Sequence, residues 1–190
     1  MSATNDVFQF ITPQNWRIIK PEYYKEFSIL STESVPCLYG FAISRIIGGY
    51  DVVSMYDYGD SSEEFFEELI AQMKLLSKDS SLIQSTNDFI SENADGYEVT
   101  STNMMKPLFF KRGTLFGKRC FVNIMKIGTN VGIGYSLQIF VSVDGHLVCF
   151  GTSVATLDEN DPLNSIIDKY DFVHEMIHTL IKSLTTTTKN

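Results

Sequence analysis

The chain has 190 residues, of which 44% are hydrophobic and 13% aromatic, so it can bury a core and is not a disordered polymer. Its formal net charge of -8 argues against a general nucleic-acid binder and against a polybasic membrane anchor. The three cysteines are an odd number without CxxC spacing, so they make a poor disulfide framework. This favours a reducing compartment.

The N-terminal quarter of the chain is rich in strand-forming residues. Two short extended pieces are expected around Pro13 and Trp16, where the sequence alternates in part. The runs 26–32 and 37–47 predict a short strand and a longer one. The tyrosine-rich stretch 50–58 either continues the longer strand or forms a loop.

A helix is expected over 62–77, and its start has the plainest signals in the sequence. Ser61 as N-cap with Glu64 three residues later predicts a capping box. Glutamates crowd the first two turns, where the helix dipole favours negative charge. An apolar stripe at helical spacing follows, made of Phe65, Phe66, Leu69, Met73 and Leu76.

The middle of the chain is predicted to be β-rich. A turn cluster at 93–96 separates two expected strands, and 120–127 predicts another. The segments 134–143 and 147–154 predict a hairpin, because Asp144-Gly145 is a two-residue turn signal between apolar runs.

A final helix is expected from Asp161-Pro162 to about residue 184. Asp161 can cap it and Pro162 suits its first position. Its apolar face would contain Ile166, Tyr170, Val173, Ile177, Leu180 and Leu184.

This order of elements predicts an α+β fold. In the expected architecture, one mid-chain helix and one C-terminal helix pack on a twisted, mainly antiparallel sheet. No internal repeat and no long linker divides the sequence, so 1–190 is predicted to be a single domain. Residues 1–7 and 185–190 are expected to be frayed.

Several motifs in this order resemble the PsbP-like superfamily, which includes the photosystem II protein PsbP, Ran-binding Mog-type proteins and small bacterial proteins. The N-terminal motifs are "FQFITPQNW", "EFSILST" and "LYGFAISRI", and the helix motif is "SSEEFFEELI". The hairpin "LQIFVSVDGHLVCF" and the final helix "IHTLIKSL" complete the set, so the resemblance extends over 8–184. The stretch 48–58 and the basic insertion 106–119 depart from the family pattern.

The resemblance implies an α/β/α sandwich and a role in binding or assembly rather than a reaction. The family has no shared catalytic residues, so no catalytic residue of this chain follows from it.

The final helix contains the H-E-x-x-H pattern of zinc peptidases, at His174, Glu175 and His178. In such enzymes the two histidines bind the metal, the glutamate activates a water molecule and a third protein ligand is required. Residues 179–190 contain no His, Asp or Glu, and the only other histidine is His146. The sequence therefore predicts no metal and no catalytic residue; Glu175 as base with His174, His178 and His146 as ligands is the alternative.

Helical spacing supports this preference. With 100° per residue, the two histidines lie on the flank of the apolar face and Glu175 points nearly opposite to it. Cys120 and Cys149 lie in apolar runs without a predicted base beside them, so their use as nucleophiles is unsupported.

Two groups of residues are candidates for contact with a partner. Residues 99–143 contain six basic residues and no Asp or Glu. Within this segment Lys111, Arg112, Lys118 and Arg119 could form a docking surface for an anionic partner, or be solvated residues that face acidic helices. Tyr56 and Tyr58 could be interface residues, or could cover an edge of the sheet.

Together these observations predict a cytoplasmic, soluble, non-catalytic protein that binds another protein or assembles with itself. No cofactor, nucleic acid or membrane is expected as a partner. A zinc-dependent hydrolase and a small-ligand carrier with a pocket between helix and sheet are the alternatives.

Overall fold

The computed structural model describes residues 2–4, 7–14, 16–19, 37–44, 50–76, 105–129 and 132–187. The strand expected over 26–32 and the turn cluster at 93–96 lie outside these residues.

Seven strands form the large sheet, in the order β3-β4-β5-β9-β8-β7-β6, and every neighbouring pair is antiparallel. They are β3 (Arg17–Ile19), β4 (Cys37–Ser44), β5 (Tyr50–Asp57), β6 (Met105–Leu115), β7 (Lys118–Thr129), β8 (Gly132–Val143) and β9 (His146–Val154). The tyrosine-rich stretch is therefore a strand, β5, which lies between β4 and β9. The basic insertion forms β6, at the edge of the sheet.

The predicted β8–β9 hairpin is confirmed. Asp144 and Gly145 connect the strands with φ angles of 47° and 89°, the positive values of a type I′ turn. Val143 pairs with His146 directly beside this turn. A type I′ turn matches the right-handed twist of the two strands, which explains why Asp-Gly predicts the hairpin so well.

A second, three-stranded sheet joins the two ends of the chain. In it β2 (Phe8–Ile11) pairs with both β1 (Ser2–Thr4) and β10 (Thr185–Thr186). Residues 2–4 and 185–186 lie in the terminal ranges for which fraying was expected, and here they form strands. The backbone of β2 offers hydrogen-bonding partners on both of its edges, and composition alone does not reveal them.

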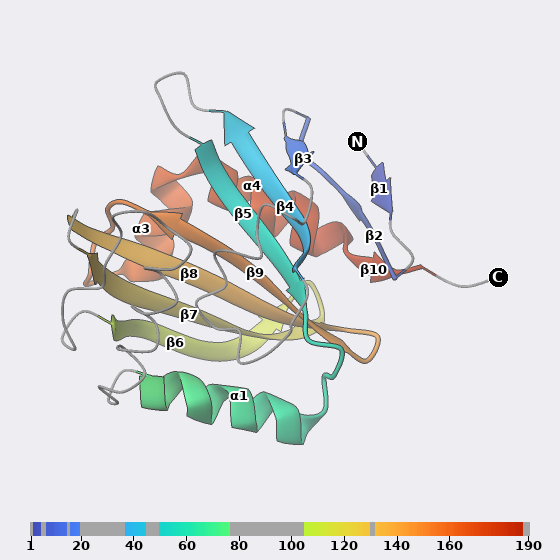
Figure 1. Cartoon of the computed structure of the whole chain (residues 1–190), viewed down its shortest axis with the longest axis horizontal. Helices are drawn as coiled ribbons and strands as arrows, with labels where there is room; N and C mark the ends of the chain where they lie inside the picture. Colours follow the sequence, from blue (N-terminus) through green and yellow to red (C-terminus); the bar gives the residue numbers. More distant parts are fainter. Residues whose placement is uncertain are drawn as a thin grey trace.

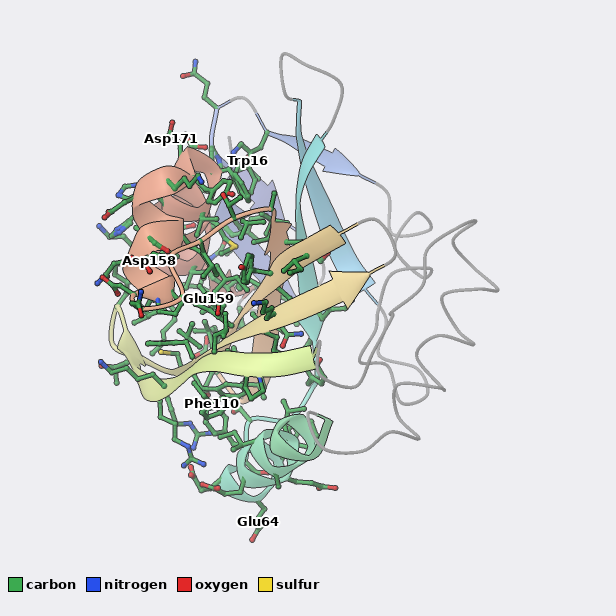
Figure 2. All side chains as sticks on the ribbon, turned by 90° about the vertical axis from the view of Figure 1, so that its left-hand side faces the viewer. Trp16, Glu64, Phe110, Asp158, Glu159 and Asp171 are labelled. Carbon is green, nitrogen blue, oxygen red and sulfur yellow. The ribbon has the colours of Figure 1, made fainter. Side chains whose placement is uncertain are left out.

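Helix α1 (Glu63–Leu76) agrees with the predicted mid-chain helix, but its cap differs from the prediction. Ser62, rather than Ser61, accepts the hydrogen bond from the N–H group of Phe65, at 3.2 Å. Asp60 accepts in turn from the N–H group of Ser62, at 2.7 Å. Glu64 is exposed and points away from the sheet (Figure 2), so the predicted capping box is not the cap observed.

The predicted C-terminal helix is divided into three pieces: α3 (Pro162–Lys169), α4 (Asp171–Glu175) and the π-helix η3 (Met176–Ile181). Pro162 takes the first position of α3, as predicted. The prediction of a single continuous helix was wrong, because Tyr170 has an extended backbone with φ −119° and ψ 97°. Its hydroxyl group donates to the carbonyl oxygen of Thr156 and accepts from the Thr156 N–H group, so a tertiary contact holds the break.

The helices cover opposite faces of the large sheet, which confirms the α/β/α sandwich (Figure 1). Residues alternate between the two faces along β7: Phe121 packs toward α1, whereas Val122 and Ile124 belong to the core on the other side. On the α1 face, the rings of Phe66 and Phe121 meet edge to face at 4.8 Å. Burying a phenylalanine of this kind stabilises the fold by roughly 1.5–3 kcal/mol.

Candidate functional site

The H-E-x-x-H residues lie on the solvent side of the C-terminal helices. Val173, Ile177 and Leu180 are buried against the sheet, and His174, Glu175 and His178 are exposed. The predicted separation of an apolar face from this motif is thus confirmed.

Glu175 has a partner from the other end of the chain. The indole Nε1 of Trp16 donates a hydrogen bond to Glu175 Oε2 at 2.8 Å. Trp16 is buried in the core and lies beside the C-terminal helices (Figure 2). The carboxylate therefore helps to hold the N-terminal segment, which is a structural role that sequence spacing could not reveal.

The two histidine side chains lie next to each other. Their ring centroids are 4.3 Å apart and the ring planes are inclined by 29°. His174 lies in α4 and His178 in η3, so the pair spans the change from α-helix to π-helix. Such single π turns are frequent at functional sites.

The third histidine has other partners. Nδ1 of His146 lies 3.0 Å from Asp57 Oδ2, and its ring meets that of Phe8 edge to face at 5.3 Å. Within the part of the chain that the structure describes, no three His, Cys, Asp or Glu side chains are grouped so as to hold a metal ion. The structure thus brings His174 and His178 together without His146.

A hairpin tip adjoins the histidine pair. Phe116 and Gly117 form the turn between β6 and β7, with φ angles of 52° and 78°. The Phe116 ring meets that of His178 at 5.7 Å, and Lys182 Nζ lies 5.8 Å from its centre. Lys118 Nζ donates to the carbonyl oxygen of Lys182 at 3.3 Å. We call Phe116, Lys118, His174, His178 and Lys182 the hairpin-tip patch.

Phe116 has an unusual backbone conformation for its residue type. A left-handed φ is common for Asn, Asp and Gly but rare for a bulky residue, because its Cβ approaches the carbonyl oxygen. The ring is nevertheless 40% exposed, so burial in the core does not explain the strain. Sequence reasoning missed this residue; the signal was the Phe-Gly pair in a predicted β region.

The predicted basic docking surface is divided by contacts with α1. Arg112 Nη2 lies 2.5 Å from Glu67 Oε1, and Arg119 pairs with Glu63. Arg119 also donates to the carbonyl oxygen of Ser61. Both arginines therefore face an acidic helix of their own chain, as the second interpretation of this segment expected.

Both guanidinium groups also lie over an aromatic ring of α1. The Arg119 Cζ atom is 4.6 Å from the centre of the Phe66 ring, and that of Arg112 is 5.7 Å from it. A cation over an aromatic face contributes about 0.5–1 kcal/mol at exposed sites. Lys111, on β6, is exposed, and Lys118 belongs to the hairpin-tip patch.

The two candidate tyrosines pack under α1. Both are half-buried beside the cluster that contains Phe66 and Phe140. The Tyr58 ring lies 5.9 Å from that of Phe140, and burial raises the pKa of its hydroxyl far above the ordinary value. The contacts of Tyr56 and Tyr58 favour a packing role over an exposed interface.

The two cysteines in apolar runs are buried. Burial raises the pKa of the Cys149 thiol strongly and also raises that of Cys120. A thiol held in its neutral form is a poor nucleophile, so both side chains act as small apolar groups in the core.

The structure is similar to that of cyanobacterial PsbP (CyanoP) from Synechocystis sp. PCC 6803, with a TM-score of 0.54 at 14% sequence identity. The match covers 98% of this chain and 91% of that chain. The chain has a PsbP-like fold. The predicted fold resemblance is therefore confirmed.

Two further structures are similar to smaller degrees. LpqN, involved in cell envelope biogenesis of Mycobacterium tuberculosis, has a TM-score of 0.42 at 12% identity, covering 95% of this chain and 83% of that chain. A protein from Bacteroides thetaiotaomicron VPI-5482 has a TM-score of 0.45 at 9% identity, covering 96% and 46% respectively. TM-scores below 0.5 do not establish a shared fold. No protein-family model and no curated protein matches the sequence.

None of the helices in the described ranges is both long enough and apolar enough to cross a membrane.

Proposed function

We propose that the chain is a non-catalytic protein-binding or assembly module, and that the hairpin-tip patch is its contact surface. One observation carries the proposal: Phe116 is exposed and held in a left-handed turn that Asn would adopt with less strain. An exposed aromatic residue at a strained position is better explained by contact with a partner than by the fold.

The composition of the patch supports a protein partner. Aromatic residues are enriched at protein interfaces and often anchor them. Around Phe116 the patch has two imidazoles and the ammonium groups of Lys118 and Lys182, which can form a polar rim. The predicted docking set is thus reduced to its lysines, since Arg112 and Arg119 are paired with α1.

The test replaces the aromatic side chain without disturbing the turn. Phe116→Asn suits a left-handed turn position, so the free energy of unfolding should rise by about 1 kcal/mol. For a chain of this size the melting temperature should then rise by about 2–4 °C. At the same time, self-association measured by sedimentation velocity over the micromolar range should weaken.

Ile133→Asn is the matched control, because Ile133 is 50% exposed in β8 and has an ordinary strand conformation. It should leave association near wild type and should not raise the free energy of unfolding, because Asn is disfavoured in a strand. If Phe116→Asn associates as the wild type does, the patch has no role in assembly.

The zinc-dependent hydrolase remains a prediction that a direct experiment can decide. As a general base, Glu175 would have to leave the indole of Trp16, which now occupies one of its carboxylate oxygens. Peptidase activity that is lost in Glu175→Gln and retained in Trp16→Phe would support this alternative over a binding role.

The small-ligand carrier has less support. The space between the sheet and the C-terminal helices is filled by side chains that are fully buried, including Leu137, Ile166 and Leu180. A ligand there would have to displace close-packed residues, which is costly.

A further inference from the structure

We propose that the histidine pair is half of a metal site, completed by the histidine pair of a second copy of the chain. Four imidazoles would surround one transition-metal ion, for which Zn²⁺ suits the tetrahedral geometry. The inference rests on the proposed assembly role and gives that role a definite partner: the chain itself.

The two rings are already placed as one half of such a site. Zn–N bonds of about 2.0–2.1 Å in a tetrahedral site bring two ligating nitrogens within roughly 3.3 Å of each other. The ring centroids of His174 and His178 are 4.3 Å apart and both side chains are exposed. The two residues are four positions apart and share one exposed face of the helix, so side-chain rotation is the movement needed to bring one nitrogen of each ring to this separation.

Among the residues that the structure describes, no further ligand adjoins the histidine pair. His146 is paired with Asp57, and Glu175 accepts the hydrogen bond from Trp16. In the sequence that follows His178, no residue has an imidazole, carboxylate or thiol side chain. Two imidazoles alone leave half of the tetrahedral positions open, and a second histidine pair fills them with the same chemistry.

A two-fold axis through the exposed helix face, midway between His174 and His178, would let a second copy complete the site. Antiparallel helices that cross at this point place His174 of one copy opposite His178 of the other. The same register brings Lys182 of one copy close to Asp171 of the other, and both residues are exposed. Asp171 lies at the solvent-facing start of α4 (Figure 2).

The neighbouring charges make the half-site weak on its own. Lys182 and Lys118 lie beside it and oppose a free cation. In the dimer, Asp171 of the second copy offsets Lys182, and the exposed Phe116 ring lies next to His178, where the second copy can cover it. The metal is therefore held firmly only when two copies meet.

The experiment measures mass by light scattering on protein without a histidine tag, first in EDTA and then with ZnCl₂ at one ion per two chains. We expect a zinc-dependent dimer that contains one zinc per two chains. His174→Ala and His178→Ala, which alter exposed side chains, should stay folded and remain monomeric with zinc. His146→Ala should dimerise as the wild type does.

A charge exchange tests the register. Asp171→Lys alone should weaken the zinc-dependent dimer by about tenfold, because it places a lysine opposite Lys182 of the second copy, and Asp171→Lys combined with Lys182→Asp should restore it.

The possible failures are distinct. Absence of a zinc-dependent dimer, or one that persists in both histidine variants, overturns the metal site. A dimer that forms equally in EDTA also overturns it, but retains the proposed assembly role if Phe116→Asn abolishes that dimer.

Discussion

At the scale of single residues, the motif that most suggests chemistry has a structural partner. Glu175 is the glutamate of H-E-x-x-H, yet its carboxylate accepts a hydrogen bond from the indole N–H group of Trp16. The two residues are 159 positions apart in the sequence, so no local pattern could have shown the contact. This hydrogen bond fastens the N-terminal segment to the C-terminal helix.

Trp16→Phe should therefore destabilise the protein. The substitution removes a donor to a charged acceptor, a loss of about 1 kcal/mol where the acceptor is exposed, and it also leaves part of the indole volume unfilled. The measurement is chemical denaturation of Trp16→Phe, Glu175→Ala and the double variant. Their effects should be non-additive by about 0.5–1 kcal/mol, and strict additivity would show that the contact contributes nothing.

At the scale of secondary-structure elements, the sequence predicted those helices and strands whose formation depends on residues close together in the chain. The Asp144-Gly145 turn supplies both positive φ angles, so the β8–β9 hairpin was predictable. The range of α1 followed from its apolar stripe, although the cap shifted by one residue to Ser62 because Asp60 supports that serine. The break at Tyr170 was not predictable, since a distant threonine causes it.

Tyr170→Phe tests whether the hydroxyl group holds the break between α3 and α4. The variant loses hydrogen bonds with the N–H and carbonyl groups of Thr156, so the free energy of unfolding should fall by about 1–2 kcal/mol. Tyr135→Phe is the control, because the Tyr135 hydroxyl group bonds only one exposed side chain, that of Glu159, among the contacts described. Thermal unfolding followed by circular dichroism gives both values. Equal losses in the two variants would contradict a special role for Tyr170.

At the scale of the whole molecule, the order of elements predicted the layers but not the contacts between distant parts. An amphipathic helix and a half-buried strand each need a covering layer, and this requirement leads to helices packed on a sheet; the three-layer sandwich followed from the resemblance. The pairs Arg119–Glu63 and Arg112–Glu67 depend on how α1 lies across β6 and β7. The histidine pair and Phe116 likewise meet only because a hairpin tip reaches the last helix. Their proximity is a consequence of the assembled fold.

The two sheets of the molecule are linked at Asp144, in the β8–β9 turn. Its carboxylate oxygen Oδ2 accepts a hydrogen bond from the hydroxyl group of Thr186, in β10, with an O–O distance of 2.7 Å. Hydrogen bonds from the side chain and the N–H group of Thr186 lower the pKa of Asp144. The contact therefore favours the ionised carboxylate and ties the C-terminal strand to the large sheet.

This link predicts a defined dependence of stability on pH. A carboxyl group whose pKa is lower in the folded state stabilises the fold above its unfolded value of about 3.9, and this contribution disappears as pH falls through the folded pKa. Asp144→Asn preserves the turn, because Asn accepts positive φ angles, but removes the charge. At neutral pH the variant should be less stable by under about 1 kcal/mol, since the group is exposed. The difference in melting temperature from wild type should shrink as pH falls below about 4 and vanish in stronger acid.

Thr186→Val, which keeps the carboxylate and removes the hydroxyl donor, should show a smaller pH-dependent difference than Asp144→Asn. A difference that grows on acidification would mean that the ionised form of Asp144 does not stabilise the link between the sheets.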